Sequence, residues 1–369
     1  MYEHQGLKDI IFIMLYGGAT FFAIMVCFYM LLTRGNMFSY AITPPKSLRR
    51  WAAAFMAMVA ASHVWWVVLG IHVLADDRLT RNIVAITLDR LTIVPLMMAV
   101  LLRMLQDRHR PVWPVFVAMI PIAVLSVYSI ITRSNDFELF TEYYSIFIGI
   151  VFIIYYVYAV RQYGRWLHDN FVDLEHKEVW QSLALLSFIL IVYLCYTSNE
   201  GSLFTEYLAQ INTLIIIAFV LWRVETLQQL DTEETIEEEE QKPVVNTINI
   251  PTYIDKLLDQ HCKDKKLFLQ HDLTLQQLAV AIGTNRTYLG AYFAQQGYTY
   301  NTYINTLRVE YFKQLYLNNK NAKQKYSYSV LAEQSGFRSY TTFSQFFKKI
   351  NGYNVTEWMR STEDNASVT

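Results

Sequence analysis

The 369-residue chain has little charge and few cysteines. Asp, Glu, Lys and Arg make up only 17% of its residues, whereas 53% are hydrophobic. Soluble domains are usually about one quarter charged, so the whole chain is not an ordinary soluble protein. The three cysteines, Cys27, Cys195 and Cys262, lie far apart and form no CxxC pair. No disulfide framework, zinc site, other metal or cofactor is therefore predicted.

Long apolar runs fill residues 1–224 instead. Each is about 18–24 residues long, the length that a helix needs to cross about 30 Å of hydrocarbon. Core helices of soluble proteins are shorter and carry a polar face, which disfavours a buried soluble bundle. The first run is too long for a signal peptide and lacks a small-residue cleavage site. Seven transmembrane helices are predicted, at Ile10–Leu32, Trp51–Leu74, Ile83–Leu105, Val112–Thr132, Tyr143–Tyr163, Trp180–Thr197 and Leu203–Val224.

The basic residues of the short loops predict an orientation. The first, third and fifth loops hold ten Lys and Arg residues, whereas the N-terminus and the other three loops hold four. Since cytoplasmic loops are enriched in Lys and Arg, the N-terminus is predicted outside and the C-terminus inside. A multi-pass protein of a bacterial inner membrane, with the lipid bilayer as a partner, is the expected localisation.

Residues 225–250 differ sharply from the apolar runs. The stretch Glu225–Glu240 contains eight acidic residues and no basic one. We interpret 225–250 as a solvated acidic linker. In an alternative interpretation the last apolar helix continues and pairs with a second copy, although the acidic charge and the absence of heptads disfavour a long coiled coil.

The stretch from Leu273 to Phe293 is typical of a helix–turn–helix. Thr274 can cap a first helix, whose apolar residues recur at helical spacing. Gly283 stands where a chain leaving a helix often needs positive φ. Thr284 or Asn285 can cap a second helix, which places Leu289 and Phe293 against the first. Two short helices crossing at a glycine turn can present the second helix to a DNA major groove.

A similar pattern follows about fifty residues later. A short helix is predicted from Val330 to the turn at Gly336, and a second one over Ser339–Lys349 with Phe343 and Phe347 on its inner face. The helical segment Tyr300–Leu317 joins the two units, with Leu307, Tyr311 and Leu315 expected to pack. This second unit contains Ala332, Gly336, Phe337, Phe343, Phe347, Lys348, Lys349 and Gly352.

With these residues in place, positions 250–360 resemble the DNA-binding domain of AraC-family transcription regulators. The resemblance implies an all-α fold with two helix–turn–helix units and double-stranded DNA as the partner. Val355 departs from the family pattern, which usually has proline there, and this is expected to loosen the start of the last helix. From Pro251 to Arg360 there are fourteen basic against seven acidic residues, a surplus expected of a phosphate-binding surface.

Candidate DNA contacts lie on the outer faces of the two second helices. Arginine can bind guanine and asparagine can bind adenine through paired hydrogen bonds. Lys348 and Lys349 are expected to bind phosphate, which positions a protein without reading sequence. The alternative for each residue is a solvated side chain. The predicted base contacts are Asn285, Arg286, Thr287, Arg338, Tyr340, Thr341, Ser344 and Gln345.

Polar residues of the apolar part are candidates for a ligand site open to the outside. Ionisable groups in a membrane are costly and are often functional. Asp89 and Arg90 are adjacent and so cannot simply neutralise each other. An interfacial tyrosine belt with snorkelling charges is the alternative to a ligand site. The candidate ligand cup comprises His72, Asp89, Arg90, Tyr143, Tyr196 and Glu206.

The sequence thus predicts an all-α, one-component membrane regulator rather than an enzyme. A small-molecule or envelope signal is expected to act through the membrane part, and homodimerisation is left open. Two alternatives remain: a DNA-binding protein merely anchored in the membrane, and a transporter or membrane enzyme with a DNA-binding tail. The absence of an internal repeat or of a clustered catalytic set disfavours the latter. The predicted parts are residues 1–224 (seven helices), 225–250 (linker), 251–360 (DNA-binding domain) and 361–369 (disordered tail).

Overall fold

The computed structural model describes residues 7–39, 42–74, 76–187, 189, 203–230, 253–321 and 327–367. Within these ranges the regular structure is helical and contains no strand. The chain divides into two compact units. One comprises Met1–Gly164 and His176–Glu240, and the other comprises Arg165–Glu175 and Gln241–Thr369. Residues 165–175, which the sequence places in the membrane part, therefore pack with the C-terminal unit.

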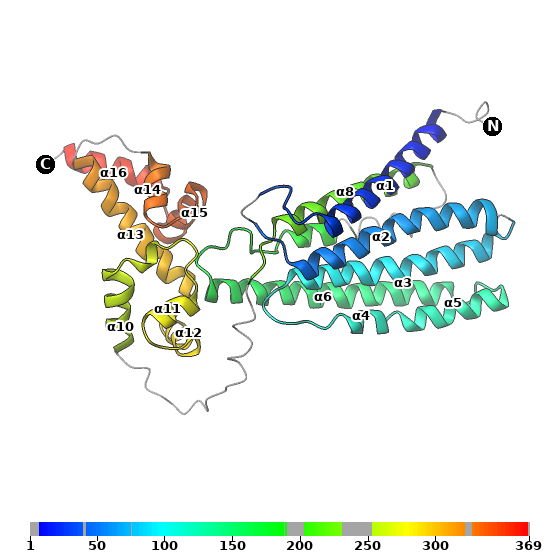
Figure 1. Cartoon of the computed structure of the whole chain (residues 1–369), viewed down its shortest axis with the longest axis horizontal. Coiled ribbons are helices and arrows are strands. Elements are labelled where there is room, and N and C mark those ends of the chain that lie inside the picture. Colours follow the sequence, from blue (N-terminus) through cyan, green and yellow to red (C-terminus); the bar gives the residue numbers. More distant parts are fainter. Residues whose placement is uncertain are drawn as a thin grey trace. The chain divides into compact units, whose positions relative to one another are not determined.

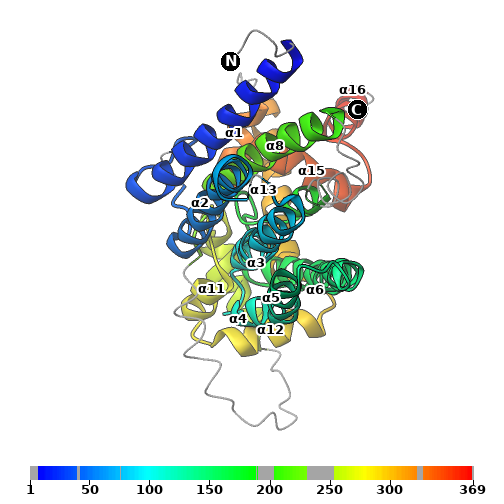
Figure 2. The ribbon, with the colours of Figure 1, turned by 90° about the vertical axis from the view of Figure 1, so that its right-hand side faces the viewer.

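The first unit is a bundle of long helices (Figures 1 and 2). Helix α2 packs against both α1 and α3, α8 packs against α1, and α5 packs against α3. Helix α6 joins this group through Tyr144, whose hydroxyl donates to the Ala118 carbonyl at 3.1 Å. The helices are α1 (Leu7–Leu32), α2 (Lys46–Val68) with the π-helical turn η1 (Leu69–Val73), α3 (Arg78–Met104), α4 (Trp113–Val117), α5 (Ile120–Thr132), α6 (Glu138–Asn170) and α8 (Leu203–Thr226).

Six stretches of described helix are long and apolar enough to cross a membrane, judged by length and composition. They correspond to six of the seven predicted runs. In the remaining one, Trp180–Thr197, residues 188 and 190–197 lie outside the described residues, so the count of seven stays a prediction. The six stretches are Asp9–Leu32, Lys46–Val68, Arg78–Met104, Trp113–Thr132, Glu138–Asn170 and Glu206–Thr226.

The end of α8 is fixed to the bundle by a buried carboxylate. Glu225 is fully buried, and its side chain forms an ion pair with Arg49 of α2 at 3.0 Å and accepts from the Tyr29 hydroxyl at 3.0 Å. Leu227 and Leu230 are also buried. The start of the stretch predicted as a solvated linker is therefore packed, because this one carboxylate has a basic partner on α2.

The second unit consists mainly of shorter helices (Figure 1). They pack around two apolar clusters. Helix α13 crosses from one cluster to the other, so that it contributes Tyr300 and Ile304 to the first and Phe312 and Tyr316 to the second. The elements are α10 (Tyr253–Leu257), η2 (Leu258–Asp264), η3 (Leu267–Leu269), α11 (Leu275–Ala281), α12 (Arg286–Gln295), α13 (Tyr300–Asn321), α14 (Tyr328–Gln334), α15 (Tyr340–Asn351) and α16 (Val355–Ser367).

The last helix is longer than the sequence suggested. Helix α16 continues through Ser367, into the residues expected to form a disordered tail. Its first turn is closed by a reciprocal pair: the Glu357 N–H donates to the Asn354 side chain and the Asn354 N–H donates to the Glu357 carboxylate, both at 2.9 Å. This capping box satisfies amides at the helix start, so the helix forms with Val355 in place of proline.

Candidate DNA-binding surface

The first helix–turn–helix unit consists of α11 and α12. Thr274 and Gln277 form a capping box at the start of α11, and Gly283 takes the left-handed conformation, with φ 74°, between the helices. Asn285 caps α12 by accepting from the Tyr288 N–H at 2.8 Å. Leu289 and Phe293 are buried, as their spacing predicted. The turn therefore fixes the direction of α12 relative to α11.

The second unit repeats this design with α14 and α15. Gly336 has φ 94° between the two helices, and Ser339 caps α15 by accepting from the Thr342 N–H at 3.2 Å. Phe343 and Phe347 are fully buried, which confirms the predicted inner face of α15. The two units thus share their turn chemistry although their sequences differ.

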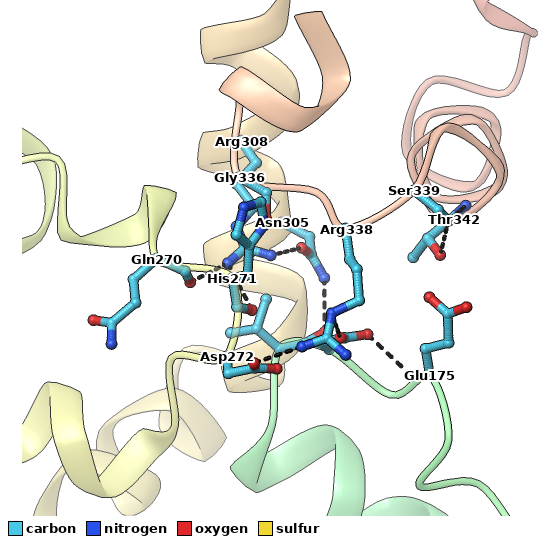
Figure 3. A network of polar contacts seen from close by, with 12 residues as sticks. Glu175, Gln270, His271, Asp272, Asn305, Arg308, Gly336, Arg338, Ser339 and Thr342 are labelled. Atoms are coloured by element: carbon cyan, nitrogen blue, oxygen red, sulfur yellow. Dashed lines mark hydrogen bonds and ion pairs between the residues drawn. The ribbon is translucent and has the colours of Figure 1, made fainter. Parts of the chain in front are cut away.

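One buried arginine of α13 connects the two units. The guanidinium of Arg308 donates to the backbone carbonyls of Phe268 and Gln270, both at 2.7 Å, and to that of His271 at 3.3 Å. The same group lies 5.7 Å from the ring centre of Phe337. His271 in turn contacts the Gly336 carbonyl at 3.1 Å (Figure 3). Burial lowers the pKa of Arg308 to about 10, so the side chain stays charged at neutral pH.

The candidate base contacts of the first unit differ in their surroundings. The Asn285 side-chain oxygen is engaged in the helix cap, and Thr287 is exposed. Arg286 is half-buried, and its Nε donates to the side-chain oxygen of Asn170 at 2.8 Å. No pattern in the sequence indicates that a residue from the end of α6 contacts this arginine.

In the second helix–turn–helix unit, Arg338 also has partners within the protein. Its terminal nitrogen donates to Asp272 at 2.5 Å (Figure 3). Its Nε lies 3.1 Å from a carboxylate oxygen of Asp173. Tyr340 is half-buried, with its ring 5.7 Å from that of Phe343. Ser344 is half-buried and donates to the Thr341 carbonyl at 3.1 Å. Exposed side chains complete the face at Thr341, Gln345, Lys348 and Lys349.

The candidate ligand-cup residues that the structure describes lie in the helical bundle, where those with a described contact have separate partners. Asp89 accepts from the Ser62 hydroxyl at 2.6 Å and from the Trp66 indole at 2.9 Å. Arg90 donates to the Thr141 hydroxyl at 3.3 Å, so these adjacent charges are satisfied by different helices. His72 is exposed, Tyr143 is 67% exposed, Glu206 is half-buried and Tyr196 lies outside the described residues. The described side chains contain no group of His, Cys, Asp or Glu suited to a metal ion.

The sequence did not single out four residues that shape this surface: Asn170, Asp173, Asp272 and Arg308. Only Arg308 carried a usable signal. It lies four residues after Ile304 and four residues before Phe312, both of which are fully buried. The residues chosen from the sequence, Leu307, Tyr311 and Leu315, are one position away and are only partly buried. A charged residue at a buried position of a helix often marks a hydrogen-bonded connection between structural units.

Comparison with known proteins gives one match. Residues 267–361 match the family model described as a helix-turn-helix domain, which is of the AraC type. No curated protein and no solved structure matches the chain. The matched region begins at η3, contains both helix–turn–helix units and ends within α16. Residues 267–361 therefore form a helix-turn-helix domain of the AraC type, which supports DNA binding by this part of the chain.

Proposed function

We propose that this protein is a one-component transcription regulator embedded in a membrane. The observation that carries the proposal is the union, in one chain, of an AraC-type domain with six stretches of membrane-length apolar helix. The N-terminus faces the outside and the C-terminal domain faces the cytoplasm, where DNA is accessible. A small-molecule or envelope signal acting on the helical bundle alters promoter occupancy.

The two helix–turn–helix units bind neighbouring segments of the major groove. Helices α12 and α15 are the reading helices, because each follows the glycine turn of its unit. Arg286 and Arg338 stand at or just before the start of these helices, where side chains reach base edges, and arginine recognises guanine through two hydrogen bonds. Exposed Lys348 and Lys349 at the end of α15 bind phosphate. Arg308 holds the two units in a fixed arrangement.

A binding experiment with the full chain in nanodiscs tests this assignment. A duplex is first selected from a random pool, and its affinity is measured by fluorescence anisotropy at several salt concentrations. Arg338→Ala is expected to weaken binding to the selected duplex by about 1–3 kcal/mol and to relax the preference at one base position. Lys348→Ala is expected to weaken all duplexes equally and to reduce the salt slope by about one.

The outcomes separate the proposal from its rivals. An equal loss on selected and scrambled duplexes for Arg338→Ala would make that residue a phosphate contact. Failure of the full chain to select any duplex would remove the regulator hypothesis. In cells, Asp89→Asn and Arg90→Gln in the full chain test the sensing role, because they change candidate ligand-cup residues of the bundle and leave residues 165–175 in place on the DNA-binding domain. Unchanged, signal-independent promoter output would reduce the bundle to an anchor.

A further inference from the structure

Residues 165–175 reach the DNA-binding domain at the end of α6. This helix begins at Glu138 in the first unit and ends at Asn170 in the second, and the eleven residues from Arg165 to Glu175 belong to the second unit. They include three acidic residues, Asp169, Asp173 and Glu175, against one basic residue. This segment therefore has a surplus of acidic residues, whereas the DNA-binding domain with which it packs has a surplus of basic ones. We refer to residues 165–175 as the α6 extension.

The α6 extension is built into the first apolar cluster. Val172 is 3% exposed and packs with residues of α11, α12 and α13. The backbone of Phe171 pairs with that of Thr274 in an isolated antiparallel bridge. Such a bridge places chain segments side by side through main-chain hydrogen bonds, without requiring particular side chains. The extension is thus seated on α11 at the start of the first helix–turn–helix unit.

Two amides of α13 receive the same backbone. Asn301 donates to the carbonyls of Phe171 at 3.1 Å and Val172 at 2.6 Å, and Asn305 donates to the Val172 carbonyl at 3.4 Å. Both asparagines are 4% exposed. Polar groups this buried are costly unless hydrogen-bonded, so α13 presents a site matched to this segment.

Both candidate recognition arginines contact the α6 extension. Arg286 of the first unit donates to Asn170, and Arg338 of the second unit pairs with Asp173, whose side chain is only 5% exposed. An arginine recognises one guanine through two of its N–H donors. The extension engages the Nε of each arginine and places the Asp173 carboxylate beside Arg338, so it competes with DNA for both guanidinium groups.

We propose that the α6 extension is an intramolecular inhibitor of DNA binding, which holds Arg286 and Arg338 until a change in α6 withdraws it. This inference rests on the proposed function, since it takes both arginines to be DNA contacts. By linkage, any state of the bundle that favours release raises the DNA affinity by the same factor by which DNA favours that state. The extension thus connects a candidate membrane helix to both recognition helices.

The first test removes a single charge from the extension. In the full chain, Asp173→Asn removes the negative charge that pairs with Arg338. It is expected to tighten binding to the selected duplex about threefold to tenfold, because Arg338 is available to DNA in a larger fraction of the molecules. Asp264→Asn is the matched control, since it removes the same charge from an exposed position of the same domain. A lower affinity for Asp173→Asn would show that the extension positions Arg338 for DNA, and this would overturn the proposal.

The second test locks the extension in place reversibly. Residues facing each other in an antiparallel bridge have Cα atoms about 4.5–5.5 Å apart, which suits a disulfide. Phe171→Cys combined with Thr274→Cys is expected to lose at least tenfold in DNA affinity when oxidised and to recover with reductant. Each single variant serves as a control for the native cysteines and for the altered cap.

Formation of the crosslink is verified by mass spectrometry of the joined peptides. If the crosslinked protein binds the selected duplex as tightly as the reduced protein, the extension does not inhibit and the inference is wrong. The proposed function survives that outcome, because the reduced protein still binds. If Asp173→Asn, the reduced double variant and both single variants all bind no DNA although the bundle is intact, the inference and the proposed function both fail.

Discussion

Arg308 connects the two helix–turn–helix units of the C-terminal domain. The residue is 2% exposed, and its guanidinium donates to carbonyls at the turn that precedes α11, while its own helix spans both apolar clusters. A buried arginine with several backbone acceptors stabilises one arrangement of chain segments, because any displaced acceptor would lose its hydrogen bond in a dry environment. Replacement therefore affects the relation between the two helix–turn–helix units, beyond the site itself.

Arg308→Met is expected to lower the free energy of unfolding of this domain by about 3 kcal/mol, since buried carbonyls lose their donor while the apolar volume is retained. Hydrogen exchange of peptides from α11 and α14 in the full chain measures this loss locally. Arg360→Met is the control, because Arg360 is exposed. Equal protection in the two variants would show that Arg308 does not connect the units.

The two turn glycines are expected to respond differently to alanine. At Gly336 an added Cβ would lie 2.9 Å from Arg308 Nε and 3.0 Å from Leu269 Cα, and φ is +94°. At Gly283 φ is +74° but nothing lies within 4 Å. Gly283→Ala should therefore cost only the left-handed penalty of about 1 kcal/mol, and Gly336→Ala about 2–4 kcal/mol. Urea titrations followed by hydrogen exchange of α11 and α14 peptides measure both, and equal losses would contradict the close approach.

At the scale of helices and turns, the sequence predicted the parts whose chemistry is local. Thr274, Gly283 and Gly336 behave as their types suggest, because caps and left-handed turns depend on a few neighbouring atoms. Contacts between distant segments were missed: nothing near Asn170 or Asp173 in the sequence points to Arg286 or Arg338. The inner face of α13 was displaced by one residue, since Leu307, Tyr311 and Leu315 were expected to pack although the buried row runs through Arg308. Helix α16 was shortened because its last residues are polar.

The end of α8 provides a test at this scale. Removing the fully buried Glu225 carboxylate leaves Arg49, whose side chain is 10% exposed, without its ion-pair partner. Glu225→Ala is expected to destabilise the bundle by about 3 kcal/mol, because a nearly buried charge loses its counter-charge. Thermal unfolding of the full chain in detergent measures the loss, with exposed Asp136→Asn as the control. An unchanged melting temperature would show that Glu225 contributes nothing to the stability of the bundle, as expected of a solvated linker residue.

For the whole molecule, the proposed orientation is tested by the accessibility of its loops. Single cysteines are placed at Ser134, between α5 and α6, and at Gly35, after α1, in a chain whose native cysteines are replaced. The excess of basic residues in the odd loops predicts that Ser134→Cys reacts with an impermeant maleimide in intact cells. Gly35→Cys should react only after permeabilisation. The reverse pattern would place the DNA-binding domain outside and exclude the proposed function.

In the proposed function, the link between the helical bundle and the DNA-binding domain limits which DNA the protein can reach. A regulator held at a membrane would search only the DNA that reaches the bilayer. The α6 extension adds a second restriction, since Arg286 and Arg338 are engaged within the protein itself. Promoter occupancy should therefore depend both on these arginines and on the residues that hold them.

Chromatin immunoprecipitation with sequencing, applied to the full-length protein in its own cells, tests the central claim most directly. The account predicts peaks in promoter regions that share one sequence motif, that disappear in the Arg286→Ala, Arg338→Ala double variant and that strengthen in Asp173→Asn. The protein carrying these peaks should sediment with the membrane fraction. Peaks that persist in the double arginine variant, or the absence of any shared motif, would contradict a membrane-embedded regulator that reads DNA through its two helix–turn–helix units.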